Sequence, residues 1–227
     1  MRFAPIFLAL GIASSAQAQA DRLTVVELFT SQGCSSCPPA NANLAKLADR
    51  PDVLALSFGV TYWDDLGWKD TFASKAYTQR QYDYAKGLNH DNVFTPQLVI
   101  NGRRDDVGVS WAKVDQLLKA VPAPISGSAI KLSGASVTLN GASVPGRPAQ
   151  VWLVRYDPRV LNIPIKRGEN TGKTLPHRNV VKELVRLGDY AGKPVTYQLP
   201  AASDPGLKTA VLVQSGLGGP IIAAAKG

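Results

Sequence analysis

Two cysteines, Cys34 and Cys37, are the residues of this 227-residue chain with the clearest chemical potential. They are the only cysteines in the chain, and two residues separate them. That spacing suits thiol–disulfide exchange, because the second sulfur can attack a mixed disulfide formed by the first. We expect Cys34 to be the nucleophile, Cys37 to be the resolving thiol, and the pair to form a reversible disulfide.

The pair lies where a predicted strand leads into a predicted helix. Residues 23–29 are rich in β-branched and apolar side chains, as in a buried strand. Residues 40–49 contain good helix formers, and the prolines that follow Cys37 are tolerated in a first helical turn. Amide groups and the dipole at a helix N-terminus favour negative charge, so we expect the pKa of Cys34 to be lowered and Cys34 to be the more exposed thiol.

The segments that follow alternate between strand and helix patterns as far as residue 120. Strands are predicted at Val53–Val60, Gln97–Ile100 and Asp105–Val109, and helices at Thr71–Lys86 and Ser110–Ala120. The order of elements is β-α-β-α-β-β-α. With a C-x-x-C pair at the first strand–helix junction, this order resembles the thioredoxin fold.

That resemblance assigns roles to four further residues. Thioredoxin-like proteins carry a cis-proline that faces the cysteines and helps to hold a substrate chain, and Pro96 after Thr95 stands at that place. A trans-proline that starts a strand is the alternative; the cis form costs only about 0.5–1 kcal/mol more. Gly33, Thr95 and Pro96 are therefore the expected substrate-binding residues. Glu27 matches a buried acid that assists proton transfer at the second cysteine, or else it reaches solvent or a lysine at the strand end.

Several blocks along the chain form a longer pattern. The first runs from Val25 to Pro38 and includes both cysteines. The others are Tyr62-Trp63-Asp64, Leu66-Gly67-Trp68, Phe94-Thr95-Pro96-Gln97, Asn101-Gly102-Arg103, Arg167-Gly168-Glu169-Asn170, and Gln214 with Gly219-Pro220. Together they resemble a bacterial secreted family known as domain of unknown function 1223. The resemblance covers nearly all of the chain after the first twenty residues, implies a thioredoxin-like domain, and leaves the activity unassigned.

The N-terminus has the features of an export signal. Arg2 precedes a short apolar run at residues 5–12, and the small residues at 16–20 offer cleavage sites. A membrane-spanning helix needs about 20 residues, so an uncleaved anchor is the lesser alternative. We expect residues 1–20 to be a signal peptide and the protein to be periplasmic or secreted.

Charge and pattern divide the remaining chain into two parts. Residues 21–121 carry a net charge of −1 and residues 122–227 a net charge of +8. Pro, Gly and Ser at 122–128 predict a linker between a thioredoxin-like α/β domain at 21–121 and a smaller antiparallel β-sandwich at 129–227. The second part has short β-prone runs at 129–132, 136–139, 150–156, 195–199, 209–214 and 220–224, and we interpret 180–187 as a strand as well.

Basic residues gather in the second part: Lys166, Arg167, Lys173, Arg178, Lys182 and Arg186. One interpretation is contact with an anionic membrane, glycan or protein; the other, which we favour, is a solvated face. We expect no nucleic-acid partner, because no module of aromatic and basic residues occurs. The segment from Arg167 to Thr174 is one residue short of a phosphate-loop spacing, and we interpret it as a turn.

The composition narrows the function classes. The chain is 45% hydrophobic and 19% charged, which favours a folded core over disorder, and its single long apolar stretch excludes a protein with several membrane spans. We favour an exported thiol–disulfide oxidoreductase without a cofactor, acting on protein or small thiols with an unknown redox partner. One alternative is a copper-binding protein that uses the two thiolates with His90 or His177, although each histidine is expected at the surface. The other is an interaction protein with a structural disulfide, although closing so short a loop removes little chain entropy.

Overall fold

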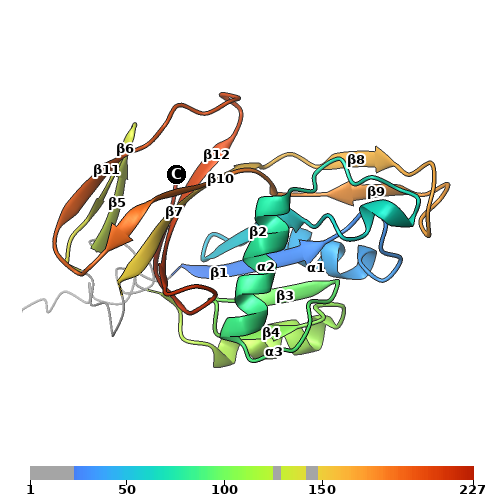
Figure 1. The fold of residues 1–227 in the computed structure, drawn as a ribbon, viewed down its shortest axis with the longest axis horizontal. Helices are drawn as coiled ribbons and strands as arrows, with labels where there is room; N and C mark the ends of the chain where they lie inside the picture. The colour runs from blue at the N-terminus through green and yellow to red at the C-terminus, as the bar shows by residue number, and fades with distance from the viewer. Residues whose placement is uncertain (1–22, 125–128, 142–147) are drawn as a thin grey trace, which may run out of the picture.

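The computed structural model describes residues 23–124, 129–141 and 148–227. The predicted signal peptide and residues 125–128 of the predicted linker lie outside these ranges. The described residues form three α-helices, one short 3-10 helix and thirteen strands, and eight of the strands make one mixed sheet (Figure 1). None of these helices is long and apolar enough to cross a membrane.

The first part of the chain follows the predicted order of elements. Its elements are β1 (Thr24–Thr30), α1 (Pro38–Ala48), β2 (Val53–Gly59), η1 (Asp64–Leu66), α2 (Lys75–Gly87), β3 (Gln97–Ile100), β4 (Arg104–Asp106) and α3 (Trp111–Ala120). Strand β1 pairs in parallel with β2 and antiparallel with β3. Asn101 and Gly102 adopt positive φ angles of 52° and 61° in the turn between β3 and β4, as their turn signal predicts.

The described residues of the second part form nine strands. They are β5 (Ile130–Ser133), β6 (Ser136–Leu139), β7 (Ala149–Asp157), β8 (Leu161–Pro164), β9 (Thr174–His177), β10 (Val180–Tyr190), β11 (Val195–Gln198), β12 (Lys208–Ser215) and β13 (Ile221–Lys226). The strands predicted from the sequence are confirmed, including the one at 180–187. The β8–β9 hairpin was not expected, because its short strands carry few β-branched residues.

One sheet joins the two parts of the chain. Its strand order is β13-β12-β7-β10-β2-β1-β3-β4, so β10 lies beside β2. Val180 pairs in parallel with Ser57, the Ser57 amide donates to the Asn179 carbonyl oxygen at 3.0 Å, and the Asn179 side chain donates to the Ala55 carbonyl oxygen at 2.8 Å. The predicted fold class, an α/β thioredoxin-like domain followed by a smaller sandwich, is therefore wrong. The edge of β2 would have been left unpaired in such a domain, and β10 covers it.

Hydrophobic clusters pack on both faces of the large sheet. On one face α2 crosses the strands, and Phe29 and Tyr84 pack there with Leu212 from β12 (Figure 1). On the other face Leu28 packs with Leu44 of α1, together with Val114 of α3. Strands β5, β6 and β11 form a separate small sheet that packs on the C-terminal strands, at the opposite end of the molecule from the β8–β9 hairpin.

Candidate functional site

Cys34 and Cys37 lie in the turn between β1 and α1. Cys37 is the N-cap residue of α1, and prolines fill the first helical positions after it. The two thiols are not joined in a disulfide, and both residues are buried, with 1% and 0% of their surfaces exposed. Cys34 is thus hardly more exposed than Cys37, because the segments described below cover both sulfurs.

The environment shifts the pKa values of the two thiols in opposite directions. The pKa of Cys34 is lowered to about 7 because the Cys37 thiol donates a hydrogen bond to its sulfur, with further help from Thr95 and the amides of Ser36 and Cys37, against the effect of burial. Burial, together with the neighbouring Cys34 sulfur, raises the pKa of Cys37. Near neutral pH the site therefore holds a thiolate on Cys34 in part of the molecules and a thiol on Cys37.

The residues expected to bind substrate lie beside the pair. The Thr95–Pro96 peptide bond is cis, as predicted, and the Cys34 thiol faces the Thr95 carbonyl oxygen at 3.8 Å. The Trp63 indole donates to the Thr95 hydroxyl at 2.7 Å, and Gly33 lies against the side chain of Trp63. We name Gly33, Cys34, Cys37, Trp63, Thr95 and Pro96 the cysteine corner.

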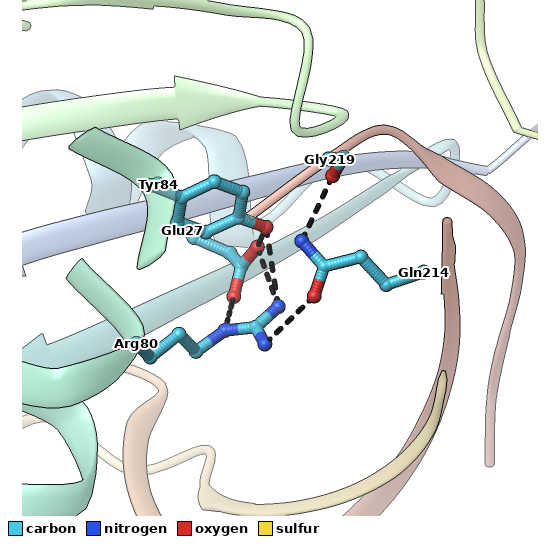
Figure 2. Close-up of polar contacts among 5 residues, drawn as sticks. All are labelled: Glu27, Arg80, Tyr84, Gln214 and Gly219. Atoms are coloured by element: carbon cyan, nitrogen blue, oxygen red, sulfur yellow. Dashed lines mark hydrogen bonds and ion pairs between the residues drawn. The ribbon is translucent and has the colours of Figure 1, made fainter. Parts of the chain in front are cut away.

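Glu27 does not reach the cysteine corner. Its carboxylate is fully buried on the α2 side of the sheet and accepts two hydrogen bonds from the Arg80 guanidinium, at 2.7 and 3.1 Å (Figure 2). The Tyr84 hydroxyl donates to the same carboxylate. All of the polar contacts described for this carboxylate are with Arg80 and Tyr84. Glu27 thus neither reaches solvent or a lysine nor lies beside Cys37.

The contacts of Glu27 belong to a larger cluster, which we name the buried network: Glu27, Arg80, Tyr84, Gln214 and Gly219 (Figure 2). Arg80 donates to the Gln214 side-chain oxygen at 3.1 Å, and Gln214 donates to the Gly219 carbonyl oxygen at 2.8 Å. Burial opposes charge on Arg80, but Glu27 raises its pKa overall. Burial, reinforced by Glu27, raises the pKa of Tyr84, which stays neutral. The network fixes β12 against α2 and β1.

The turn between β8 and β9 reaches across to the cysteines. Asn170 is fully buried, and its side-chain amide donates to the carbonyl oxygens of Gln32 at 3.0 Å and Cys34 at 2.9 Å. Exposed Glu169 accepts a hydrogen bond from the Ser35 amide at 2.9 Å. Gly168 has a φ of 78°, which favours glycine and turns the chain toward the site. The sequence indicated only a turn here; the block shared with the resembled family was the one signal of a further role.

A second indole is hydrogen-bonded close to the cysteine turn. The Trp68 indole donates to the Gln32 side-chain oxygen at 2.9 Å, and the Gln32 amide donates to Asp70 at 2.7 Å. Burial raises the pKa of Asp70 to about 6, although backbone amides donate to its carboxylate. These contacts fix the segment that precedes Gly33 and Cys34.

The two histidines lie in different surroundings. His90 is exposed, as expected, and lies 2.8 Å from the Asp105 carboxylate. The expectation of a surface residue is wrong for His177, which is only 3% exposed and packs edge-to-face on Phe72 with ring centroids 5.5 Å apart. Burial lowers the pKa of His177 to about 4. Among the described residues, no group of three or more His, Cys, Asp and Glu side chains is gathered as a metal site requires.

Most of the basic residues singled out in the second part make contacts within the chain. Arg178 pairs with Asp49 at 2.6 Å, and Lys173 donates to the Asn170 side-chain oxygen at 3.0 Å. The Lys182 ammonium lies 4.2 Å from the centre of the Phe72 ring, and Arg186 pairs with Asp189. Four of the six basic residues therefore contribute to contacts that stabilise the fold.

Comparisons with known proteins identify relatives without a stated activity. The family model described as protein of unknown function (DUF1223) matches residues 25–214. A crystal structure of protein AGR_C_4864 from Agrobacterium tumefaciens is 33% identical, with a TM-score of 0.75, and the match covers 89% of this chain and 92% of that chain. HBP35 of Porphyromonas gingivalis is 15% identical, with a TM-score of 0.58 over 91% of this chain and 75% of that one, which is a likeness of fold alone. No curated protein matches.

Proposed function

Since the chain belongs to the DUF1223 family of proteins of unknown function, its activity has to be inferred from its own site, and we propose that it is an exported thiol–disulfide oxidoreductase. The observation that carries this proposal is the placement of two free thiols in one turn at the start of α1, beside the cis Thr95–Pro96 bond. The pKa values of the two thiols are shifted in opposite directions, with Cys34 lowered to about 7 and Cys37 raised. A nucleophilic thiolate beside a protonated resolving thiol is the arrangement that disulfide exchange needs.

The proposed reaction uses only sulfur chemistry. The Cys34 thiolate attacks one sulfur of a substrate disulfide, forms a mixed disulfide, and releases the other substrate sulfur as a thiolate. The Cys37 sulfur then attacks Cys34, its proton passes to the departing substrate thiolate, and the Cys34–Cys37 disulfide forms. Two electrons move from the cysteine pair to the substrate. The reverse sequence oxidises a substrate dithiol.

The surroundings of the pair support this assignment. The Thr95–Pro96 segment borders Cys34 and would hold the chain that carries the substrate sulfur. The predicted signal peptide at residues 1–20 supports action on exported protein or small thiols in the periplasm or medium. A redox partner would return the pair to its starting state. The basic residues of the second part, such as Lys166 and Arg167, are the candidates for contact with an anionic partner.

The deciding experiment is the equilibrium of the pair in glutathione buffers, followed by mass-shift labelling of free thiols. We expect a reduction potential between about −120 and −270 mV, the range of working oxidoreductases. Cys37→Ser should accumulate a mixed disulfide at Cys34, whereas Cys34→Ser should trap none. A potential below about −300 mV would overturn the proposal in favour of a structural disulfide. Stoichiometric copper kept by the reduced protein through dialysis would favour metal binding instead.

A further inference from the structure

The Ser35 amide is set apart from the amides that follow it in the cysteine turn. The amides of Ser36 and Cys37 act on the Cys34 sulfur and help to lower its pKa. The Ser35 amide instead donates to Glu169, a residue 134 positions away in the turn between β8 and β9. A carboxylate therefore occupies the backbone donor of the residue that follows the nucleophile.

Asn170, the next residue, holds the same turn by a different contact. It donates both hydrogens of its side-chain amide to carbonyl oxygens, those of Gln32 and Cys34, and its own oxygen accepts from the Lys173 ammonium. Both side-chain amide hydrogens and the side-chain oxygen are thus used, and the residue is fully buried. Because the carbonyls of Gln32 and Cys34 are fixed, the amides that follow Cys34 are fixed in the direction of its sulfur.

We propose that the β8–β9 turn sets the reactivity of Cys34, with Asn170 as a positioning residue for the cysteine turn and Glu169 as a negative charge that restrains thiolate formation. This inference deepens the proposed function and rests on it. In physical terms, Glu169 disfavours the charged form of Cys34 by repulsion and by occupying a donor, while Asn170 keeps the remaining donors in place. Residues from the second part of the chain thereby influence the reactivity of a cysteine in the first part.

Other ionisable groups near Cys34 could also affect its pKa, so the test must leave them unchanged. They are Cys37 from the start of α1, Tyr62 from the loop after β2, Asp70 from the segment between η1 and α2, and Lys173 from the β8–β9 turn itself. Burial raises the pKa of Tyr62, which stays neutral, and burial and Cys34 keep Cys37 protonated. Besides Glu169 and Lys173, the Asp70 carboxylate also acts on the turn, because its pKa of about 6 leaves it mostly charged near neutral pH.

The test compares two substitutions of exposed Glu169 in the full chain. Glu169→Gln keeps an acceptor for the Ser35 amide but removes the charge, and Glu169→Asp keeps the charge but shortens the reach. The pKa of Cys34 is read from the pH dependence of thiolate absorbance in the reduced protein. We expect Glu169→Gln to lower that pKa and give about threefold more thiolate below neutral pH. Glu169→Asp should stay closer to wild type.

Two further readouts distinguish a charge effect from a change in structure. The difference between wild type and Glu169→Gln should shrink in high salt, because exposed charges are screened. The glutathione equilibrium should shift about twofold toward the reduced pair, since a more stable thiolate stabilises the reduced form. Asp204→Asn is the matched control, because exposed Asp204 also accepts a backbone amide, that of Gly206 at 2.7 Å, in the loop between β11 and β12. It should leave the pKa of Cys34 unchanged.

The outcomes separate this inference from the proposed function. An unchanged or raised pKa of Cys34 in Glu169→Gln would overturn the role of Glu169 even if the pair cycles in glutathione. If the pKa falls as expected but the pair resists reduction in the wild type, the proposed function fails while the effect of the turn stands. For Asn170, Asn170→Ala should raise the pKa of Cys34 in protein that is still folded by circular dichroism, and a wild-type value there would overturn its positioning role.

Discussion

The cysteine corner and the buried network are both enclosed polar regions beside β1, yet they hold charge in different ways. In the buried network the Glu27 carboxylate faces the Arg80 guanidinium in two hydrogen bonds, and Tyr84 and Gln214 satisfy further donors and acceptors. In the cysteine corner, no oppositely charged side chain from the part of the chain that the structure describes contacts Cys34. Its sulfur meets a thiol, backbone amides and the Thr95 residue.

The difference explains which region can react. A buried charge that is paired keeps its charge state, because removing either partner leaves the other charge without compensation. A charge held only by dipoles and a neighbouring thiol can be gained or lost near neutral pH, as the pKa of about 7 for Cys34 indicates. Glu27 therefore has a structural role although it lies only seven residues before the nucleophile.

The largest expected effect comes from breaking the pair in the buried network. Arg80→Met leaves the Glu27 carboxylate buried without its cation, which should cost about 3–5 kcal/mol in the free energy of unfolding. The effect is measured by urea denaturation of wild type and variant. Replacing both charges, in Glu27→Leu with Arg80→Met, should recover most of that loss, because a well-packed apolar pair avoids the desolvation cost.

Glu27→Gln tests the comparison more directly. If the network is structural only, the pKa of Cys34 and the glutathione equilibrium of the pair should equal those of wild type. A clear shift in either quantity would show that Glu27 acts on the cysteines and would end the distinction between the two regions. If Arg80→Met lowers the free energy of unfolding by less than about 1 kcal/mol, Glu27 does not depend on Arg80 for compensation, and the distinction between the two regions also fails.

His177 is a third kind of buried ionisable group, with neither an ion pair nor a described partner for its Nε2 atom. Its pKa of about 4 in the folded protein lies below the unfolded value of about 6.5. The unfolded chain therefore binds more protons between these values. The resulting stability is complete above pH about 6.5 and is lost as the pH falls toward 4.

His177→Phe should remove that dependence while keeping a ring against Phe72. Between pH about 7.5 and about 4.5, wild type should lose about 2–3 kcal/mol more unfolding free energy than the variant. The pKa of Asp70, raised to about 6, acts in the opposite direction but is common to both proteins. Parallel losses in wild type and variant, measured by urea unfolding at the two pH values, would contradict the assignment.

The sequence allowed the local structure around the cysteines to be predicted. The strand–helix junction and the order of elements to residue 120 follow from residue types and short spacings, and the cis bond at Pro96 was implied by the resemblance to thioredoxin-like proteins. The pairing of β10 with β2 does not, because strand patterns show which face is buried but not which strand lies alongside. The expectation of a separate sandwich failed for that reason.

The same limit applies to the polar sites. Glu27 is bound by Arg80, 53 residues away, and the cysteine turn is held by Asn170, 136 residues from Cys34. No local pattern around either site indicates these partners. His177 follows a proline in a polar segment, and its burial depends on the hairpin that brings it against Phe72. Long-range contacts thus decide which ionisable groups are locked and which can react.

The smallest expected effect sharpens the comparison inside the cysteine corner. The Trp63 indole donates to the Thr95 hydroxyl oxygen and so orients that side chain, and Thr95 is one of the groups that lower the pKa of Cys34. Trp63→Phe should therefore raise the pKa of Cys34 slightly and cost about 1 kcal/mol in stability. The pKa is followed by thiolate absorbance.

Trp68→Phe is the matched control for this effect, because the Trp68 indole donates to Gln32 and not to Thr95. It should cost a similar amount of stability, about 1 kcal/mol, yet leave the pKa of Cys34 at its wild-type value. Equal shifts of that pKa in both variants would mean that general loosening of the site, and not the orientation of Thr95, controls the thiol. A shift in Trp63→Phe alone would show that neutral dipoles tune Cys34, in contrast to the ion pair that locks the buried network.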